Sequence, residues 1–180
     1  MKKSRTLLTF SAVVLVAVIF ITSLLQSNMK DASLSNFAMG SPVTIKVYGA
    51  KNGDDLCSNA FERISLIDSK YLSHNIVTSA VSTLNKNQSI VTDEWFSDYL
   101  EECVELSEKS SCFTLFSGEM KQLWKIEDGG YIPTTEEIAK TLENLQEFSL
   151  EINGNSISVN NDSLDLGALG KGTACDEAIE

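Results

Sequence analysis

The chain has 180 residues, of which 43% are hydrophobic, and its formal net charge is −11. This length and composition suffice for one folded domain with its own core, and neither indicates a disordered chain. All 25 Asp and Glu follow residue 30, whereas four of the 14 Lys and Arg precede residue 31. So acidic a body argues against nucleic acid as a partner, because phosphates are bound by clustered Lys and Arg.

The first predicted element is an apolar helix close to the N-terminus. Residues 7–25 contain no charged side chain, and three basic residues precede them. A helix of this length nearly spans a hydrocarbon core of about 30 Å, and the basic flank predicts a cytoplasmic N-terminus. We therefore expect residues 1–26 to anchor the chain in a cell membrane as one transmembrane helix, with an extracytoplasmic body. The alternative is a cleaved signal segment and a secreted body, although the chain matches a cleavage site poorly.

The body is expected to begin after a polar tether, residues 27–35, with a strand. Val43, Ile45 and Val47 alternate there with polar residues, which is the period of a half-buried strand. A short strand is also predicted at residues 89–91.

Several helices are predicted along the body. Apolar residues recur at helical spacing over residues 54–71 and 93–109. Thr134 and Glu137 have the spacing of a capping box, which predicts the start of another helix. That helix is expected to bury Ile138, Leu142 and Leu145. Shorter helical pieces are predicted in "TSAVSTLN" and "EMKQLW".

The strongest short-range hairpin signal is Asn153-Gly154, which has alternating apolar residues on both sides. Helices mixed with antiparallel hairpins predict an α+β fold. None of the four cysteines forms a C-x-x-C pair and His74 is the only histidine, which argues against a zinc site. The cysteines are either disulfide-bonded, which export would permit, or free buried thiols.

The C-terminal stretch "LDLGALGKGTACDEAIE" holds three glycines and Lys171. It fits neither common phosphate-binding template, because Asp165 and Cys175 stand where the Walker A and dinucleotide motifs need glycine. Glycines still let a backbone approach a ligand, and a helix start with a lysine favours an anion. Asp165 lies in an apolar run and needs a partner or a ligand. The alternative interpretation of Gly167–Gly172 is a plain strand-to-helix turn.

This stretch resembles the "DLGGIAKGYAVDRA" signature of the ApbE family, the FAD:protein FMN transferases. Four further segments resemble motifs of that family and follow in the family's order. They are "FAMGSPVTIKVYG", "IDSKYLSHNIVTSAVSTLN", "SSCFTLFSGEMKQLW" and "YIPTTEEI". The resemblance covers residues 36–180, which we predict to be the N-terminal part of an ApbE-like, T-fold-type flavin transferase domain.

The resemblance implies a Mg²⁺-dependent enzyme that transfers FMN from FAD to a Thr hydroxyl of an exported or membrane target protein. The family's second half, which completes the Mg²⁺ site with Asp and Thr side chains, has no counterpart in the sequence. Glu180 is therefore expected to be a truncation. The alternative is a flavin-binding remnant, or an inactive fragment that lacks the metal-binding half.

The resemblance also implies a set of FAD-binding residues but assigns no catalytic residue. The set is Met39, Asn75, Cys112, Phe113, Thr114, Asp165 and Lys171. Asn75 stands where many members place an aromatic residue against the isoalloxazine ring, and Thr114 replaces a family Asp. Ala168 would offer the metal an oxygen through its backbone carbonyl. Taken singly, each of these residues also fits an ordinary place in the core, in a turn or on the solvated surface.

Overall fold

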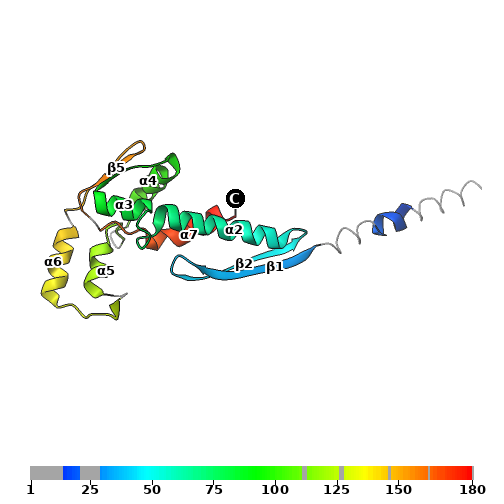
Figure 1. Ribbon diagram of the computed structural model, residues 1–180, viewed down its shortest axis with the longest axis horizontal. Helices are drawn as coiled ribbons and strands as arrows, with labels where there is room; N and C mark the ends of the chain where they lie inside the picture. Colours follow the sequence, from blue (N-terminus) through cyan, green and yellow to red (C-terminus); the bar gives the residue numbers. More distant parts are fainter. Residues whose placement is uncertain are drawn as a thin grey trace, which may run out of the picture. The chain divides into compact units, whose positions relative to one another are not determined.

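The computed structural model describes residues 14–20, 29–110, 113–125, 128–145, 147–161 and 163–179. The chain divides into two compact units, Met1–Glu62 and Arg63–Glu180. Helices and two antiparallel sheets alternate along it (Figure 1), so the predicted α+β class is confirmed.

Only residues 14–20 of the predicted apolar anchor lie in the described part, and they are helical. Within the described residues, no helix is both long enough and apolar enough to cross a membrane. The rest of the anchor lies outside the described residues, and the anchor stays a prediction.

The first unit is built on a hairpin of β1 (Lys30–Ala38) and β2 (Ser41–Ala50). Its two turn residues, Met39 and Gly40, have φ values of 52° and 68°. Positive φ at both positions is typical of the type I′ turn, whose twist matches that of the two strands.

The polar tether predicted at residues 27–35 is wrong over residues 30–35, which belong to β1. The reason is that apolar residues of this segment pair with apolar residues of β2, which the tether prediction did not consider. Ala32 and Leu34 pair with Val47 and Ile45 of β2, and these four side chains form one half-buried face of the hairpin.

The helix predicted over residues 54–71 is found as α2 (Gly53–Ile67), which continues into a π-helical turn, η1 (Asp68–Leu72). In the first unit the start of α2 touches the hairpin. The thiol of Cys57 lies 3.9 Å from the carbonyl oxygen of Ile45, and the Cys57 side chain is buried.

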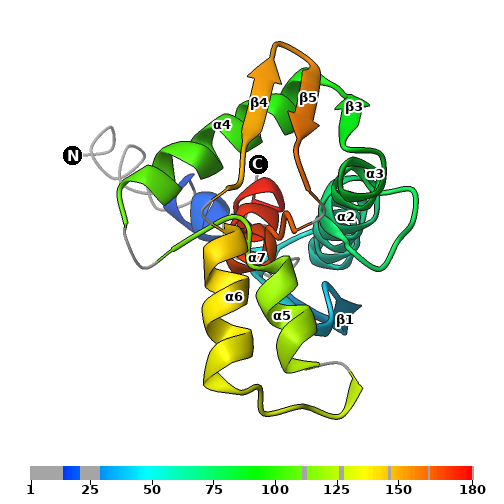
Figure 2. The same cartoon turned by 90° about the vertical axis from the view of Figure 1, so that its left-hand side faces the viewer.

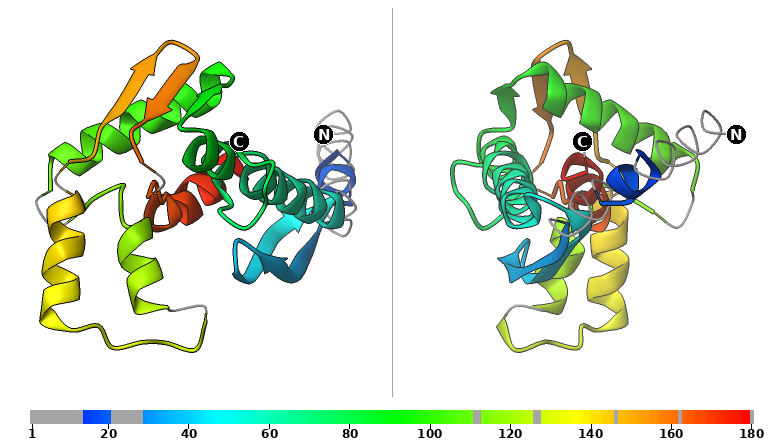
Figure 3. Two further views of the ribbon diagram at one scale, coloured as in Figure 1. Left: turned by 60° about the vertical axis from the view of Figure 1, so that its left-hand side comes forward. Right: turned by 90° about the vertical axis from the view of Figure 1, so that its right-hand side faces the viewer.

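The second unit contains a three-stranded antiparallel sheet in the order β3-β5-β4. Its strands are β3 (Ser89–Val91), β4 (Leu150–Asn153) and β5 (Ser156–Val159). The predicted hairpin at Asn153-Gly154 is confirmed, and Gly154 has a φ of 56°. Figures 2 and 3 show α4 (Glu94–Glu108) lying obliquely across this hairpin.

The other helices of this unit are α3 (Ala80–Asn87), α5 (Gly118–Trp124), α6 (Thr135–Leu145) and α7 (Gly167–Glu177). Many of the almost fully buried core side chains of this unit come from α3, α4, β5 and the segment before α7. They include Leu84, Phe96, Leu100, Ile157, Leu164 and Leu166.

The capping box that opens α6 is confirmed. The N–H of Thr134 donates to Glu137 Oε2 at 2.8 Å, and the N–H of Glu137 donates to Thr134 Oγ1 at 3.2 Å. The expected burial of Leu142 is wrong, because this side chain is 49% exposed while Thr141 is buried. α6 packs beside α5 (Figures 2 and 3). Because adjacent residues of a helix point in different directions, the orientation of α6 about its own axis decides which of these two side chains is covered.

Candidate functional site

The candidate site is centred on Asp165, whose backbone is fixed by its neighbours. The N–H of Asp165 donates to the carbonyl of Leu115 at 2.7 Å. The amide of Asn85 donates to the Leu164 carbonyl at 2.9 Å and accepts the Leu164 N–H at 3.1 Å. Leu164 and Leu166, on either side of Asp165, are each 1% exposed. This segment is therefore held by both hydrogen bonds and core packing.

The start of α5 is tied to the same segment through Gly118. The N–H of Gly118 donates to the Ser163 carbonyl at 3.0 Å. A Cβ at Gly118 would lie 2.9 Å from that oxygen, closer than atoms normally approach, so this position requires glycine. The close approach brings α5, whose last turn carries Lys121, next to Asp165.

Lys121 and Asp165 form an ion pair between the ammonium and carboxylate Oδ2. The Asp165 side chain is 9% exposed and that of Lys121 is 47% exposed. The other carboxylate oxygen, Oδ1, accepts the N–H of Gly167 at 2.8 Å. The sequence predicts that Asp165 needs a partner, and the structure identifies that partner as Lys121.

Lys121 is not one of the predicted site residues. Its helical position one turn after Gly118 follows from the predicted helix in "EMKQLW". The contact between that helix and Ser163 is tertiary, and no local signal in the sequence indicates it.

The alternative interpretation of Gly167–Gly172 as a plain strand-to-helix turn is wrong, because these residues form the first part of α7. The N–H groups of Leu169 and Gly170 already donate to the carbonyl of Leu166, at 3.2 and 2.8 Å. The N-cap of α7 is Leu166, and the carboxylate of Asp165, one residue earlier, accepts the N–H of the first helical residue, Gly167.

Gly167 leaves the start of α7 uncovered beside the ion pair. A Cβ at this position would lie 3.0 Å from Asp165 Oδ1 and 3.4 Å from Lys121 Nζ. A side chain here would crowd both charged groups. The glycine therefore keeps open the space into which the ammonium faces.

Asp165, Ala168 and Lys171 are brought together by local sequence at the beginning of α7. Ala168 lies in the first turn and Lys171 follows one turn later, and both are exposed. Ala168 is the proposed metal contact. Among the described residues, no group of three or more His, Cys, Asp or Glu side chains could hold a metal ion.

The remaining predicted FAD contacts lie on other segments. Phe113 is half-buried and Thr114 is exposed, with its hydroxyl accepting the N–H of Phe116 at 3.2 Å. Asn75 is exposed in the loop between η1 and α3. Met39 belongs to the first unit, at the hairpin turn.

The prediction for Cys112 lies outside the described residues. Where the structure describes cysteines, Cys57 and Cys103 are buried free thiols and Cys175 is an exposed one.

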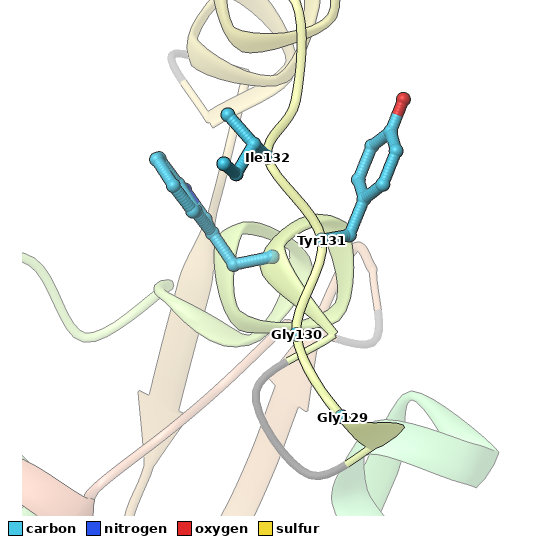
Figure 4. Close-up of a pocket in the computed structure, with 5 residues that line it drawn as sticks. Gly129, Gly130, Tyr131 and Ile132 are labelled. Carbon is cyan, nitrogen blue, oxygen red and sulfur yellow. The ribbon is translucent and has the colours of Figure 1, made fainter.

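A pocket of about 750 Å³ lies at the loop that follows α5. Its lining residues are Trp124, Gly129, Gly130, Tyr131 and Ile132. In Figure 4 the side chains of Tyr131 and Ile132 point to opposite sides of this loop. The Tyr131 hydroxyl hydrogen-bonds to Glu137 Oε2 at 3.0 Å. None of the predicted site residues lines this pocket.

The fold is that of solved ApbE proteins. The chain is 25% identical to the ApbE protein of Thermotoga maritima, with a TM-score of 0.71, over 83% of this chain and 51% of that one. It is 20% identical to the apo form of the Pseudomonas stutzeri flavinyl transferase ApbE, with a TM-score of 0.63, over 84% and 51%. The chain thus spans about half the length of each of these proteins.

The family model for ApbE matches residues 39–180. The chain belongs to the ApbE family, as the resemblance of its motifs predicts. No curated protein is similar enough to count as a match.

Proposed function

We propose that the chain carries the flavin-donor site of an FAD:protein FMN transferase, which moves FMN from FAD onto a Thr hydroxyl of a target protein. The observation that carries this proposal is the family match over residues 39–180. The matched residues include the segment around Asp165, which is held by backbone hydrogen bonds. The similarity to a flavinyl transferase supports the fold that the proposal needs.

The residues at the start of α7 fit a bound diphosphate. Gly167 has no side chain to cover the helix start, and Lys171 is exposed on the same helix. The exposed lysine favours an anion, while the N–H of Gly167 at the helix start is already bonded to Asp165 Oδ1. FAD supplies an activated flavin phosphate: its diphosphate bond breaks, an ester forms between that phosphate and the Thr oxygen, and AMP and the hydroxyl proton are released.

The described residues do not by themselves fit a Mg²⁺ site. The resemblance assigns only the backbone carbonyl of Ala168 to the metal, and no acidic cluster accompanies it in the described part of the chain. Mg²⁺ prefers six oxygen ligands in near-octahedral geometry. Dependence of the transfer on Mg²⁺ is thus a proposal from the family alone.

The proposed function is tested by two measurements on the 180-residue chain. The first is FAD titration, followed by quenching of flavin fluorescence. The second is the mass of a Thr-containing target peptide after incubation with FAD and Mg²⁺, with EDTA and a Thr→Ala peptide as matched controls. Binding together with a mass increase equal to FMN esterification supports the transferase. Binding without labelling supports the alternative, a flavin-binding module, and absence of binding contradicts both.

We also propose that the body lies outside the cytoplasm, behind an N-terminal membrane anchor. The support is the uncharged run at residues 7–25 and the basic residues before it. A secreted body after cleavage of this segment is the alternative.

A further inference from the structure

We propose that Lys121 is a second diphosphate-binding lysine of the FAD site, held in place by Asp165. This inference rests on the proposed function, because it adds a residue to the same FAD site. The motif resemblance implies Asp165 and Lys171 only, and Lys121 enters solely through its position in the fold.

Asp165 has little capacity left to contact a ligand. Its Oδ1 accepts the N–H of Gly167 at 2.8 Å, and its Oδ2 is paired with Lys121. Its side chain is 9% exposed. The carboxylate therefore acts within the chain, as the acceptor of the first N–H of α7 and as the counter-charge of a lysine.

Lys121 has the capacity that Asp165 lacks. An ammonium group has three N–H donors, and the pair with one carboxylate oxygen uses one of them. The Lys121 side chain is 47% exposed, so the other donors can reach a ligand. Its Nζ lies 3.4 Å from the position that a Cβ on Gly167 would occupy. An anion at the start of α7 would therefore lie next to this ammonium, which also offsets the charge of Asp165, whose Oδ1 lies 3.0 Å from the same position.

The position of Lys121 is fixed from both sides of the ion pair. On its own helix, Gly118 is hydrogen-bonded to Ser163 at 3.0 Å. On the other side, the Asp165 N–H is hydrogen-bonded to Leu115 at 2.7 Å. A donor held in this way loses little conformational entropy when it binds a ligand, which favours tight binding.

The test compares three probes: FAD, ADP and riboflavin. FAD and ADP contain a diphosphate, whereas riboflavin contains no phosphate. In the Lys121→Met variant, we expect the Kd for FAD and for ADP to rise about tenfold, as for the loss of one charge-assisted hydrogen bond. The Kd for riboflavin should rise less than about twofold, since its ring does not need the ammonium.

Lys109→Met is the matched control. Lys109 is the C-cap residue of α4 and is also paired with a carboxylate, that of Glu105, and its side chain is 69% exposed. The substitution changes the net charge by the same amount, at the C-terminal end of α4. We expect it to leave all three dissociation constants unchanged. A tenfold loss of FAD binding in this control would assign the Lys121 effect to net charge and overturn the proposal.

A second variant guards against simple misfolding. Lys121→Met leaves the mostly buried Asp165 carboxylate without its partner, which destabilises the fold. The double variant Lys121→Met/Asp165→Asn removes both charges, and we expect it to keep the thermal midpoint of the parent and the same selective loss. Lys121→Arg, which keeps the charge, should recover most of the FAD and ADP binding.

Two further results would overturn the inference alone. An equal loss for all three probes would mean that Lys121 only supports the fold, and no loss for FAD would place it away from the ligand. Failure of the unsubstituted chain to bind FAD is a different result, because it contradicts the proposed function and this inference together.

Discussion

The indole N–H of Trp95 donates to Oε1 of Glu177 at 2.6 Å and joins the start of α4 to the last turn of α7. The other oxygen of Glu177 is paired with Arg63, and the Glu177 side chain is 16% exposed. Burial acts to raise the pKa of Glu177, but the bonds from Trp95 and Arg63 outweigh it and hold the pKa below the ordinary value of 4.5. The carboxylate thus secures the end of the helix that begins at the candidate site.

Glu177→Gln should lower the free energy of unfolding by about 1 kcal/mol at pH 7, because it removes a charged hydrogen-bond acceptor whose partner Arg63 is partly solvated. Since the folded pKa is depressed, this stabilisation is present above pH 4.5 and is lost as the pH falls through the folded pKa. Urea unfolding at pH 7, 5.5 and 4 measures the difference. A difference between the two proteins that grows toward acid pH would contradict this account.

Asp93 is the N-cap of α4 and accepts three hydrogen bonds. They come from Lys70 Nζ at 2.7 Å, the Tyr71 hydroxyl at 2.6 Å and the Phe96 N–H at 3.3 Å. We expect Asp93→Ala to cost about 1–2 kcal/mol of unfolding free energy, measured by chemical denaturation, because a cap and two side-chain bonds are lost.

The matched control for Asp93 is Lys70→Met. The Lys70 and Asp93 side chains are 52% and 43% exposed, so their ion pair is well solvated. Removing it should cost less than about 0.5 kcal/mol. Equal losses in the two variants would show that the ion pair, and not the cap, is what stabilises α4.

Gly118→Ala should destabilise the second unit by about 1–3 kcal/mol, because the new Cβ would lie 2.9 Å from the backbone oxygen of Ser163. Gly172→Ala is the control within α7: a Cβ there meets nothing within 4 Å. Alanine at this helical position should stabilise the fold by about 0.5–1 kcal/mol. Thermal unfolding of both variants measures the contrast, and a tolerated alanine at residue 118 would show that α5 can move away from Ser163.

Lys171→Met should weaken FAD binding about tenfold and riboflavin binding much less, if this lysine faces the diphosphate. Its exposure on α7 permits such a contact. Fluorescence titration with both flavins measures the effect. Equal weakening for the two would place Lys171 away from the phosphates, and unchanged binding would leave it as a solvated surface lysine.

A reporter enzyme fused after Glu180 tests the predicted topology. With residues 7–25 as a membrane anchor and basic residues before it, the fusion should be active only when the reporter requires an extracytoplasmic location. Replacing the three basic residues with acidic ones is the control and should reduce export. Activity of a cytoplasmic reporter at the same position would mean that the topology is reversed.

Elements that depend on neighbouring residues were predictable from the sequence. The Thr134 and Glu137 capping box, the hairpin at Asn153-Gly154 and the helix over residues 93–109 all appear in the structure. Each is decided by backbone geometry and by hydrogen bonds a few residues apart. The motifs of the ApbE family also lie in continuous segments, and for that reason the amino-acid sequence by itself is enough to indicate the family.

Features that depend on contact between distant segments required the tertiary structure. The sequence indicates that Asp165 needs a partner, but it does not single out Lys121 among the other lysines of the body. That choice follows from the close approach of Gly118 to Ser163, which no local pattern encodes. The exposure of Leu142 likewise depends on the packing of α6 against α5. The pattern of the amino-acid sequence shows which side chains must be buried or paired. The packing of the helices and strands decides which neighbouring residue buries or pairs with each of them.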